Sequence, residues 1–253
     1  MIETHHSQAS QKNLRFRIVK CAMFLFSREG IKPVTMDRIA KELQISKRTL
    51  YEIFNDKEEL LLEGVCVFKE LMNRYSEDLA QKVDNVLELM LIMYQLRLNE
   101  MRFVTPRFYS DMRKYPSVVR FMRDSMNRET DKVQAFMKCG VEQGLFRKDV
   151  NFEVIHRVIF SQVEFVMQNL LPERYPLVEL FDSFILVCMR GFSTEKGVRQ
   201  IEDFVKRRGC MTDDFPEALY EYWPDNCDID ALLSNKRNRI EVEKKRPDDD
   251  AKS

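Results

Sequence analysis

Apolar residues recur at steps of three and four along almost the whole chain, and this spacing restricts the fold more than any other feature. It places the apolar side chains on one face of an α-helix, whereas a half-buried strand would need alternation at steps of two. Runs of strand-forming residues joined by tight-turn dipeptides are missing, and the sequence has only 7 glycines and 8 prolines. The sequence therefore predicts an all-α protein.

The size and composition of the chain fit a protein with its own hydrophobic core. Hydrophobic residues make up 44% of the sequence and charged residues 32%, which is ordinary for a soluble globular protein. A chain of 253 residues can form one large domain or two smaller ones without disulfide bonds. The 6 cysteines are scattered with no CxxC spacing, which favours reduced thiols in a cytoplasmic protein. The polar N-terminus and the absence of an apolar run of about 18 residues predict no signal sequence and no membrane span.

Charge is distributed unevenly, although the formal net charge of the chain is zero. Residues 11–57 contain 11 lysines and arginines against 5 aspartates and glutamates, an excess of six positive charges. Residues 209–253 contain 7 basic against 12 acidic residues, an excess of five negative charges. A basic front indicates an anionic partner such as a nucleic acid, which the net charge alone would conceal.

The front of the chain predicts helices with clear start and stop signals. Four helices are expected, over residues 12–28, 35–43, 47–54 and about 57–81. Gly30 suits the left-handed geometry that follows many helix ends, while Thr35, Ser46 and Asp56 are side chains that cap helix N-termini. Two short helices joined by a tight turn form the helix-turn-helix layout, in which the second short helix enters the major groove of DNA.

Longer helices follow, separated by prolines and glycines. They are expected over residues 84–100, 103–113, 116–143, 151–171 and 176–193. The expected domains are an N-terminal helix-turn-helix domain at 1–56, a larger helical domain at 57–208 and an acidic, partly disordered extension at 209–253.

The second short helix concentrates groups that suit DNA. If Leu50 and Ile53 point into the core, Lys47 and Arg48 point outward, where both can reach phosphates and Arg48 can also read guanine. Tyr51 offers a phenol on the same exposed side. The alternative is a solvated helix face, the usual setting of a Lys–Arg pair. The residues expected to contact DNA are Thr35, Ser46, Lys47, Arg48, Thr49, Tyr51 and Lys57.

The segment "AMFLFSREGIKPVTMDRIAKELQISKRTLYEIFNDKEELL" resembles the DNA-binding domain of the TetR family of bacterial transcriptional regulators. The matching positions keep the family's spacing over some 35 residues: Phe26, Gly30, Thr35, Ile39, Ala40, Ser46, Thr49, Leu50, Tyr51, Phe54, Lys57, Glu58 and Leu60. One departure is Gln44, which stands in the turn where the family often has glycine. A residue other than glycine there implies some backbone strain.

The resemblance implies more than the residues show by themselves. It implies a homodimer, usually a repressor, that binds a palindromic operator in double-stranded DNA. The helices at 151–171 and 176–193 look similar to the two helices that pair in such dimers. It also implies that Thr35, Lys47, Thr49, Tyr51 and Lys57 touch mainly phosphate, and that Arg48 falls where a base contact is plausible. A small-molecule effector would bind in the larger domain, no cofactor is implied, and release from DNA would be a shift between two populations.

The larger domain is rich in methionine and aromatic side chains, which adapt to apolar ligands. The pocket candidates are Met90, Met93, Tyr94, Phe103, Phe108, Tyr109, Phe121, Met122, Met126, Phe136 and Phe165. Core packing is the alternative for each of them. His156 lies among apolar residues and reads as a core or interface histidine, and the pair His5–His6 lacks further metal ligands, so no metal site is expected.

Two other classes of function were weighed against a ligand-controlled regulator. The sequence contains no glycine-rich phosphate loop, no HExxH, no CxxC and no Ser/His/Asp pattern, so an enzyme is not expected. A helix-turn-helix regulator controlled by a protein partner, acting through the acidic extension, is the alternative.

Overall fold

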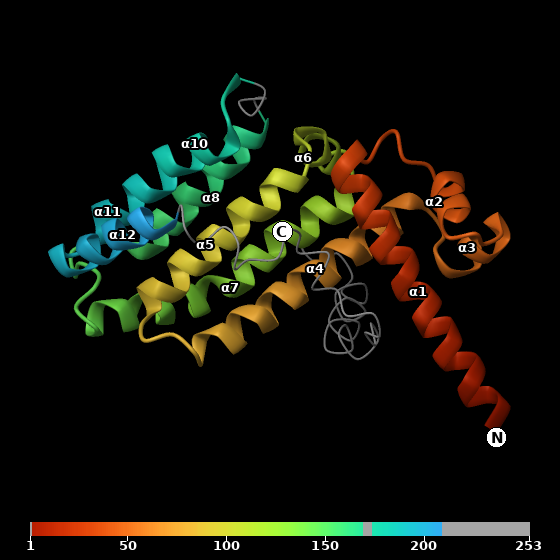
Figure 1. Ribbon diagram of the computed structural model, residues 1–253, viewed down its shortest axis with the longest axis horizontal. Helices are drawn as coiled ribbons and strands as arrows, with labels where there is room; N and C mark the ends of the chain where they lie inside the picture. The colour runs from red at the N-terminus through yellow and green to blue at the C-terminus, as the bar shows by residue number, and fades with distance from the viewer. Residues whose placement is uncertain (1, 169–173, 209–253) are drawn as a thin grey trace, which may run out of the picture. The chain divides into compact units, whose positions relative to one another are not determined.

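The computed structural model describes residues 2–168 and 174–208, and every regular element within them is a helix (Figure 1). The elements are α1 (Ile2–Glu29), α2 (Met36–Glu42), α3 (Lys47–Ile53), α4 (Lys57–Ala80), α5 (Val86–Phe103), α6 (Pro106–Met112), α7 (Pro116–Glu142), α8 (Phe152–Gln168), α10 (Leu177–Phe181), the π-helix η1 (Asp182–Leu186), α11 (Val187–Phe192) and α12 (Glu195–Arg208). The all-α prediction is confirmed. No helix among these elements is long and apolar enough to span a membrane.

Contacts group the described residues into two compact units. The head contains residues 2–23 and 36–73, and the body contains residues 24–35, 74–168 and 174–208. The units divide within α1 and within α4, whereas the sequence places the domain boundary at 56/57, before α4 begins. The predicted boundaries therefore stay predictions, and residues 209–253, the predicted acidic extension, lie outside the described residues.

The head is built on one apolar layer that fixes the two short helices. In Figure 1, α2 and α3 lie beside each other next to α1. Ile39 of α2, Leu50 of α3 and Ile18 of α1 are completely buried. Phe16 of α1 is only 1% exposed. Burying a large apolar side chain contributes about 1.5–3 kcal/mol. This layer is what holds α3 with one face outward.

The turn between α2 and α3 adopts the backbone that the sequence suggested. Gln44 has φ 55°, in the left-handed region, and its amide donates to the Lys41 carbonyl at 3.1 Å. The next amide, of Ile45, donates to the Ala40 carbonyl at 3.0 Å. A residue with a Cβ is strained at this φ, so the turn keeps its shape against a local preference. Gly30 also has a positive φ, 89°, as predicted from its place after the first helix.

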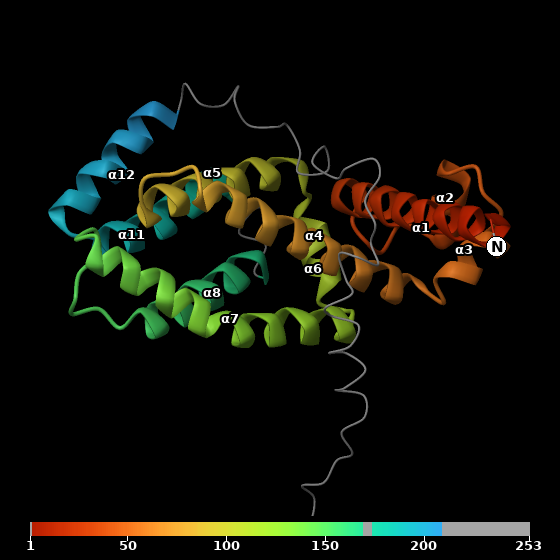
Figure 2. The same cartoon turned by 90° about the horizontal axis from the view of Figure 1, so that it is seen from below.

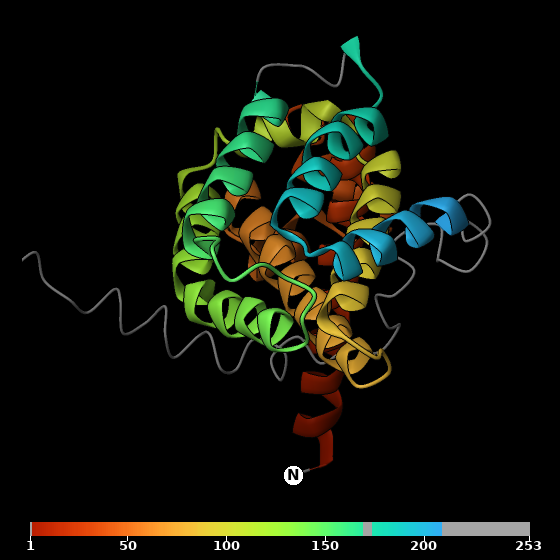
Figure 3. The same cartoon turned by 90° about the vertical axis from the view of Figure 1, so that its left-hand side faces the viewer.

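The body is a group of helices around α5, which is buried on several sides. Figures 2 and 3 show this group from two further directions, with α12 set against α5 and α11. One core cluster joins Leu87 and Leu91 of α5 to Phe146, Phe192 and Ile201, which lie in or beside α7, α11 and α12. A β-bridge between Phe146 and Ser193 ties the segment after α7 to the start of α12.

Several predicted element boundaries were wrong. The first helix begins at Ile2 rather than residue 12, and α5 and α6 begin at Val86 and Pro106 rather than at 84 and 103. The segment 176–193 is not one α-helix, because η1 interrupts it. Helix α12 was missed altogether. Residues 169–171, predicted as the end of a helix, lie outside the described residues.

Candidate nucleic-acid interface

Helix α3 is placed by a cap at its start and buried residues along one side. The Ser46 hydroxyl accepts a hydrogen bond from the Thr49 amide at 3.0 Å and lies 2.8 Å from the Thr49 hydroxyl. This is the N-cap geometry that serine favours, and it confirms the predicted helix start. Leu50 and Phe54 are completely buried and Ile53 is half-buried, so the opposite face of α3 is directed to solvent.

That outward face carries the cations and the phenol. The side chains of Lys47 and Arg48 are 60% and 88% exposed, and Tyr51 is 42% exposed. An arginine and a lysine on one exposed helix face can bind phosphate, and a guanidinium can also form two parallel hydrogen bonds to guanine. The predicted outward orientation of these three residues therefore agrees with the structure.

Each of the two cations has an acidic partner on the same surface. The Lys47 ammonium donates to the Asp37 carboxylate of α2 at 2.9 Å, and the Arg48 Nε donates to Glu52 Oε1 at 2.9 Å. These hydrogen bonds raise the pKa of both cations. Sequence reasoning did not single out Asp37 or Glu52, although Arg48 and Glu52 stand at the i,i+4 spacing of a helical ion pair.

The remaining predicted contact residues flank α3. Thr35 is exposed and directly precedes α2, and Lys57 is half-buried at the first position of α4. The cap predicted for α4 is confirmed, since Asp56 Oδ1 accepts from the Glu59 amide at 2.8 Å. That carboxylate accepts from one of the helix-end amides, and the Lys57 side chain lies at the same end of the helix.

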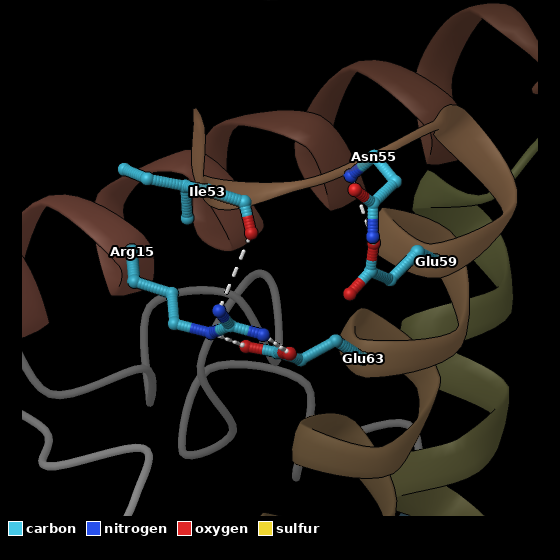
Figure 4. A network of polar contacts seen from close by, with 5 residues as sticks. All are labelled: Arg15, Ile53, Asn55, Glu59 and Glu63. Atoms are coloured by element: carbon cyan, nitrogen blue, oxygen red, sulfur yellow. Dashed lines mark hydrogen bonds and ion pairs between the residues drawn. The ribbon is translucent and has the colours of Figure 1, made fainter. Parts of the chain in front are cut away.

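A polar network that the sequence did not predict fixes the end of α3 (Figure 4). Arg15 of α1 donates through Nε to Glu63 Oε1 of α4 at 2.6 Å and through Nη2 to Glu63 Oε2. Its Nη1 donates to the Ile53 carbonyl at 3.4 Å, and its guanidinium lies 4.6 Å from the centroid of the Phe54 ring. Beside it, the Asn55 amides donate to Glu59. Three helices of the head are thereby joined at the point where α3 ends.

The head's sequence matches a known family. The model of bacterial regulatory proteins of the tetR family matches residues 18–63, which span the C-terminal part of α1, both short helices and the start of α4. Residues 18–63 therefore carry the N-terminal domain of this family.

Relatives and solved structures extend this likeness beyond the head. The chain is 29% identical over 164 residues to an HTH-type transcriptional regulator of Staphylococcus aureus strain bovine RF122 / ET3-1, covering 57% of this chain and 84% of the relative. A TetR-family regulator from Agrobacterium tumefaciens is 16% identical with TM-score 0.58, covering 74% of this chain and 100% of that one. Another, from Marinobacter aquaeolei VT8, is 20% identical with TM-score 0.58, covering 77% and 98%. The family match and these relatives support a DNA-binding transcriptional regulator.

The body contains the residues predicted to line a pocket. Phe108 and Phe121 are buried, while Met90, Met93, Tyr94, Phe103, Tyr109, Met122, Met126 and Phe136 are half-buried. Phe165 is 52% exposed on α8 and so lies at a surface of the body. Half-buried His156 has a lowered pKa because of burial and the nearby Arg157 charge. Over the described part of the chain, no group of three histidine, cysteine or acidic side chains is placed to hold a metal ion.

Polar groups inside the body were not anticipated from the sequence. Gln95 and Asn99 on α5 are 2% and 7% exposed, and the Gln95 amide donates to the Asn99 side-chain oxygen at 3.0 Å. Gln95 Oε1 has no hydrogen-bond partner among the described residues. The Tyr94 hydroxyl donates to Asp182 of η1 at 2.6 Å. A buried polar atom without a partner is unfavourable by about 1–3 kcal/mol, so the Gln95 oxygen is suited to a hydrogen-bond donor from outside the chain.

Proposed function

We propose that the protein is a homodimeric, sequence-specific repressor that a small ligand releases from a palindromic operator. The main observation in support of DNA binding is the outward face of α3. There Lys47, Arg48 and Tyr51 are exposed beside the Ser46 cap. In this proposal Lys47, Thr49 and Lys57 contact phosphates, Thr35 and Ser46 add hydroxyls to the backbone contacts, and Arg48 reads a base. Such a regulator acts where bacterial DNA is, in the cytoplasm.

The proposed dimer uses the surface formed by α8 and α11. Val154, Val158 and Phe165 are 52%, 46% and 52% exposed and lie four and seven residues apart, on one face of α8. Val187 of α11 is 59% exposed. Exposed apolar side chains aligned on one helix face favour contact with another protein surface. A two-fold dimer through 151–171 and 176–193 would present two copies of α3 to successive major grooves, about 34–36 Å apart.

The proposed effector is a small apolar or amphipathic molecule bound in the body. Half-buried methionines and aromatics suit its apolar part, and the unpartnered Gln95 oxygen suits one polar group on it. A path to the head exists in the chain itself. The end of α1 is held by the body, since the Thr105 amide donates to the Ser27 carbonyl at 2.8 Å and Asp111 accepts from the Lys32 amide at 2.8 Å. Movement of α6 would therefore shift the segment that leads directly into α2.

The test is selection of bound sequences from random duplex DNA by the purified full chain, at a stated salt concentration. We expect a pseudo-palindrome. Arg48→Ala should relax preference at one base pair in each half-site, by about 1–3 kcal/mol. Lys57→Ala should weaken binding to all sequences alike and reduce the salt slope by about one unit.

Lys138→Ala is the matched control, because Lys138 is a 79% exposed lysine on α7 of the body. It should leave both affinity and preference unchanged. Recovery of no enriched sequence by the wild-type chain would refute the repressor proposal. Equal effects of Arg48→Ala and Lys57→Ala on every sequence would refute the separate roles given to these two residues. If a bound protein changed the operator affinity and no small molecule did, control by a protein partner would be favoured instead.

A further inference from the structure

The pair formed by Arg48 and Glu52 indicates a role for the glutamate as well as for the arginine. Both side chains are largely exposed, at 88% and 59%, and they are joined by one hydrogen bond of 2.9 Å between Nε and Oε1. That bond uses the Nε edge of the guanidinium and leaves the two terminal Nη groups for another partner. A bidentate contact to guanine O6 and N7 needs two such donors in a fixed plane.

We propose that Glu52 is a positioning residue that determines sequence specificity by orienting Arg48 toward a guanine. This inference rests on the proposed function and deepens it. A free arginine side chain has several rotamers, and ordering it on DNA is unfavourable. Glu52, one turn further along the same helix, holds the guanidinium in one orientation before DNA arrives.

The acid also discriminates against wrong sequences. A carboxylate on the DNA-facing surface is repelled by phosphates, so its presence weakens binding wherever Arg48 does not gain a base contact. Removing Glu52 should therefore have two opposite effects: tighter binding to bulk DNA and weaker discrimination at one base pair. A misfolded variant would not show this combination of effects, because it would lose affinity for every sequence.

The neighbouring pair offers a contrast on the same surface. Lys47 is joined to Asp37 at 2.9 Å, and its ammonium is a point charge with freely rotating donors rather than a planar fork. Asp37 can retain the lysine near α2 but cannot set the plane of a base contact. Loss of Asp37 should change affinity for all sequences without changing which sequence is preferred.

The test is selection from random duplex DNA by the full chain carrying Glu52→Ala, Arg48→Ala, both together, or Asp37→Ala. We expect Glu52→Ala to lower the preference at the base pair assigned to Arg48 by about five- to tenfold. It should also raise affinity for bulk DNA a few-fold. In the double variant, preference at that base pair should equal that of Arg48→Ala alone, because Glu52 acts through Arg48.

Glu52→Asp separates positioning from charge, since it keeps the carboxylate but shortens its reach. We expect it to lose preference as Glu52→Ala does. Full wild-type preference in Glu52→Asp would overturn the positioning role, and so would a Glu52→Ala effect confined to a different base pair, which would mean that Glu52 reads cytosine itself. An unchanged preference in Glu52→Ala would also overturn it. A wild-type chain that enriches no sequence would instead overturn the proposed function, so the two failures are distinguishable.

Discussion

Two arginine–glutamate pairs on helices, one in the head and one in the body, differ in how far their side chains are exposed. On α3, Arg48 and Glu52 are 88% and 59% exposed, whereas on α5 Arg97 is 44% exposed and Glu100 only 7%. An exposed pair contributes only about 0–1 kcal/mol to stability. For the buried Glu100, burial raises the pKa, and the Arg97 charge and hydrogen bond only partly oppose that effect. The comparison teaches that the exposed pair in the head adds little to stability, while the body retains a charge at some expense to stability.

A third pair shows that exposure rather than location decides the role. Arg15 and Glu63 belong to the head, but their side chains are 24% and 9% exposed, and Arg15 also contacts the Ile53 carbonyl and the Phe54 ring. This pair therefore supports the end of α3 rather than meeting DNA. Within one unit, the exposed pairs are available to a ligand and the buried pair is structural.

The largest effect is expected from breaking that buried pair. Arg15→Ala leaves the Glu63 carboxylate buried without its partner, and removing one member of a buried pair is unfavourable by about 3–5 kcal/mol. Because Arg15 is 24% exposed, water can reach the site, and we expect the lower end, about 3 kcal/mol. Urea unfolding followed by circular dichroism measures the loss.

The matched control replaces both members with apolar residues of similar size, Arg15→Met with Glu63→Leu. It should be close to wild type in its free energy of unfolding, because no charge is left buried. If the double variant were as unstable as Arg15→Ala, the packing of the arginine stem and ring contact would explain the loss, and the contrast between buried and exposed pairs would fail.

The local signals of the head could be predicted from the sequence, because each depends on a few neighbouring residues. Ser46 and Asp56 cap the helices that directly follow them, and Gly30 and Gln44 have the positive φ that their places in the sequence suggested. The Arg15–Glu63 pair joins residues 48 apart, and no spacing rule indicates such a contact. The outward position of Lys47, Arg48 and Tyr51 was also predictable, because it follows from the spacing of the apolar residues on the same short helix. The acidic partners of Lys47 and Arg48 were not predicted.

The body was less predictable, for different physical reasons. Helix α12 carries Val198, Ile201, Phe204 and Val205 at helical spacing, so its signal was present but was not used. The interruption at η1 was not predicted, and its first residue, Asp182, accepts a hydrogen bond from Tyr94, 88 residues away, a contact that no spacing rule indicates. The early start of α1 has another cause. An established helix extends by one hydrogen bond for each residue added, and this needs no apolar stripe.

An intermediate effect is expected at the cap of α3. Ser46→Ala removes the acceptor for the Thr49 amide and should lower the free energy of unfolding by about 1 kcal/mol. Because α3 has only 7 residues, operator affinity should fall as well. Ser46→Asn, which is also a good cap, should restore stability. Loss of operator affinity without loss of stability in Ser46→Ala would show that the hydroxyl serves DNA and not the helix.

The smallest effect, and one of opposite sign, is expected at Glu100. Its pKa in the folded chain is raised above the ordinary 4.5, mainly by burial, so the folded state binds the proton more tightly than the unfolded state does. Stability from this group is therefore present below pH 4.5 and is lost as the pH rises through the folded pKa. Glu100→Gln does not titrate, so the variant should match wild type near pH 4 and be slightly more stable near pH 8.

Urea unfolding of both proteins from pH 4 to pH 8 measures this difference. Glu142→Gln on α7 is the control, because Glu142 is 66% exposed beside Lys138 and should show little change with pH. If Glu100→Gln were instead less stable than wild type at pH 8, the Arg97 interaction would outweigh burial. The body would then hold this charge because it stabilises the fold, and the head and the body would differ only in exposure, not in what a charged pair contributes.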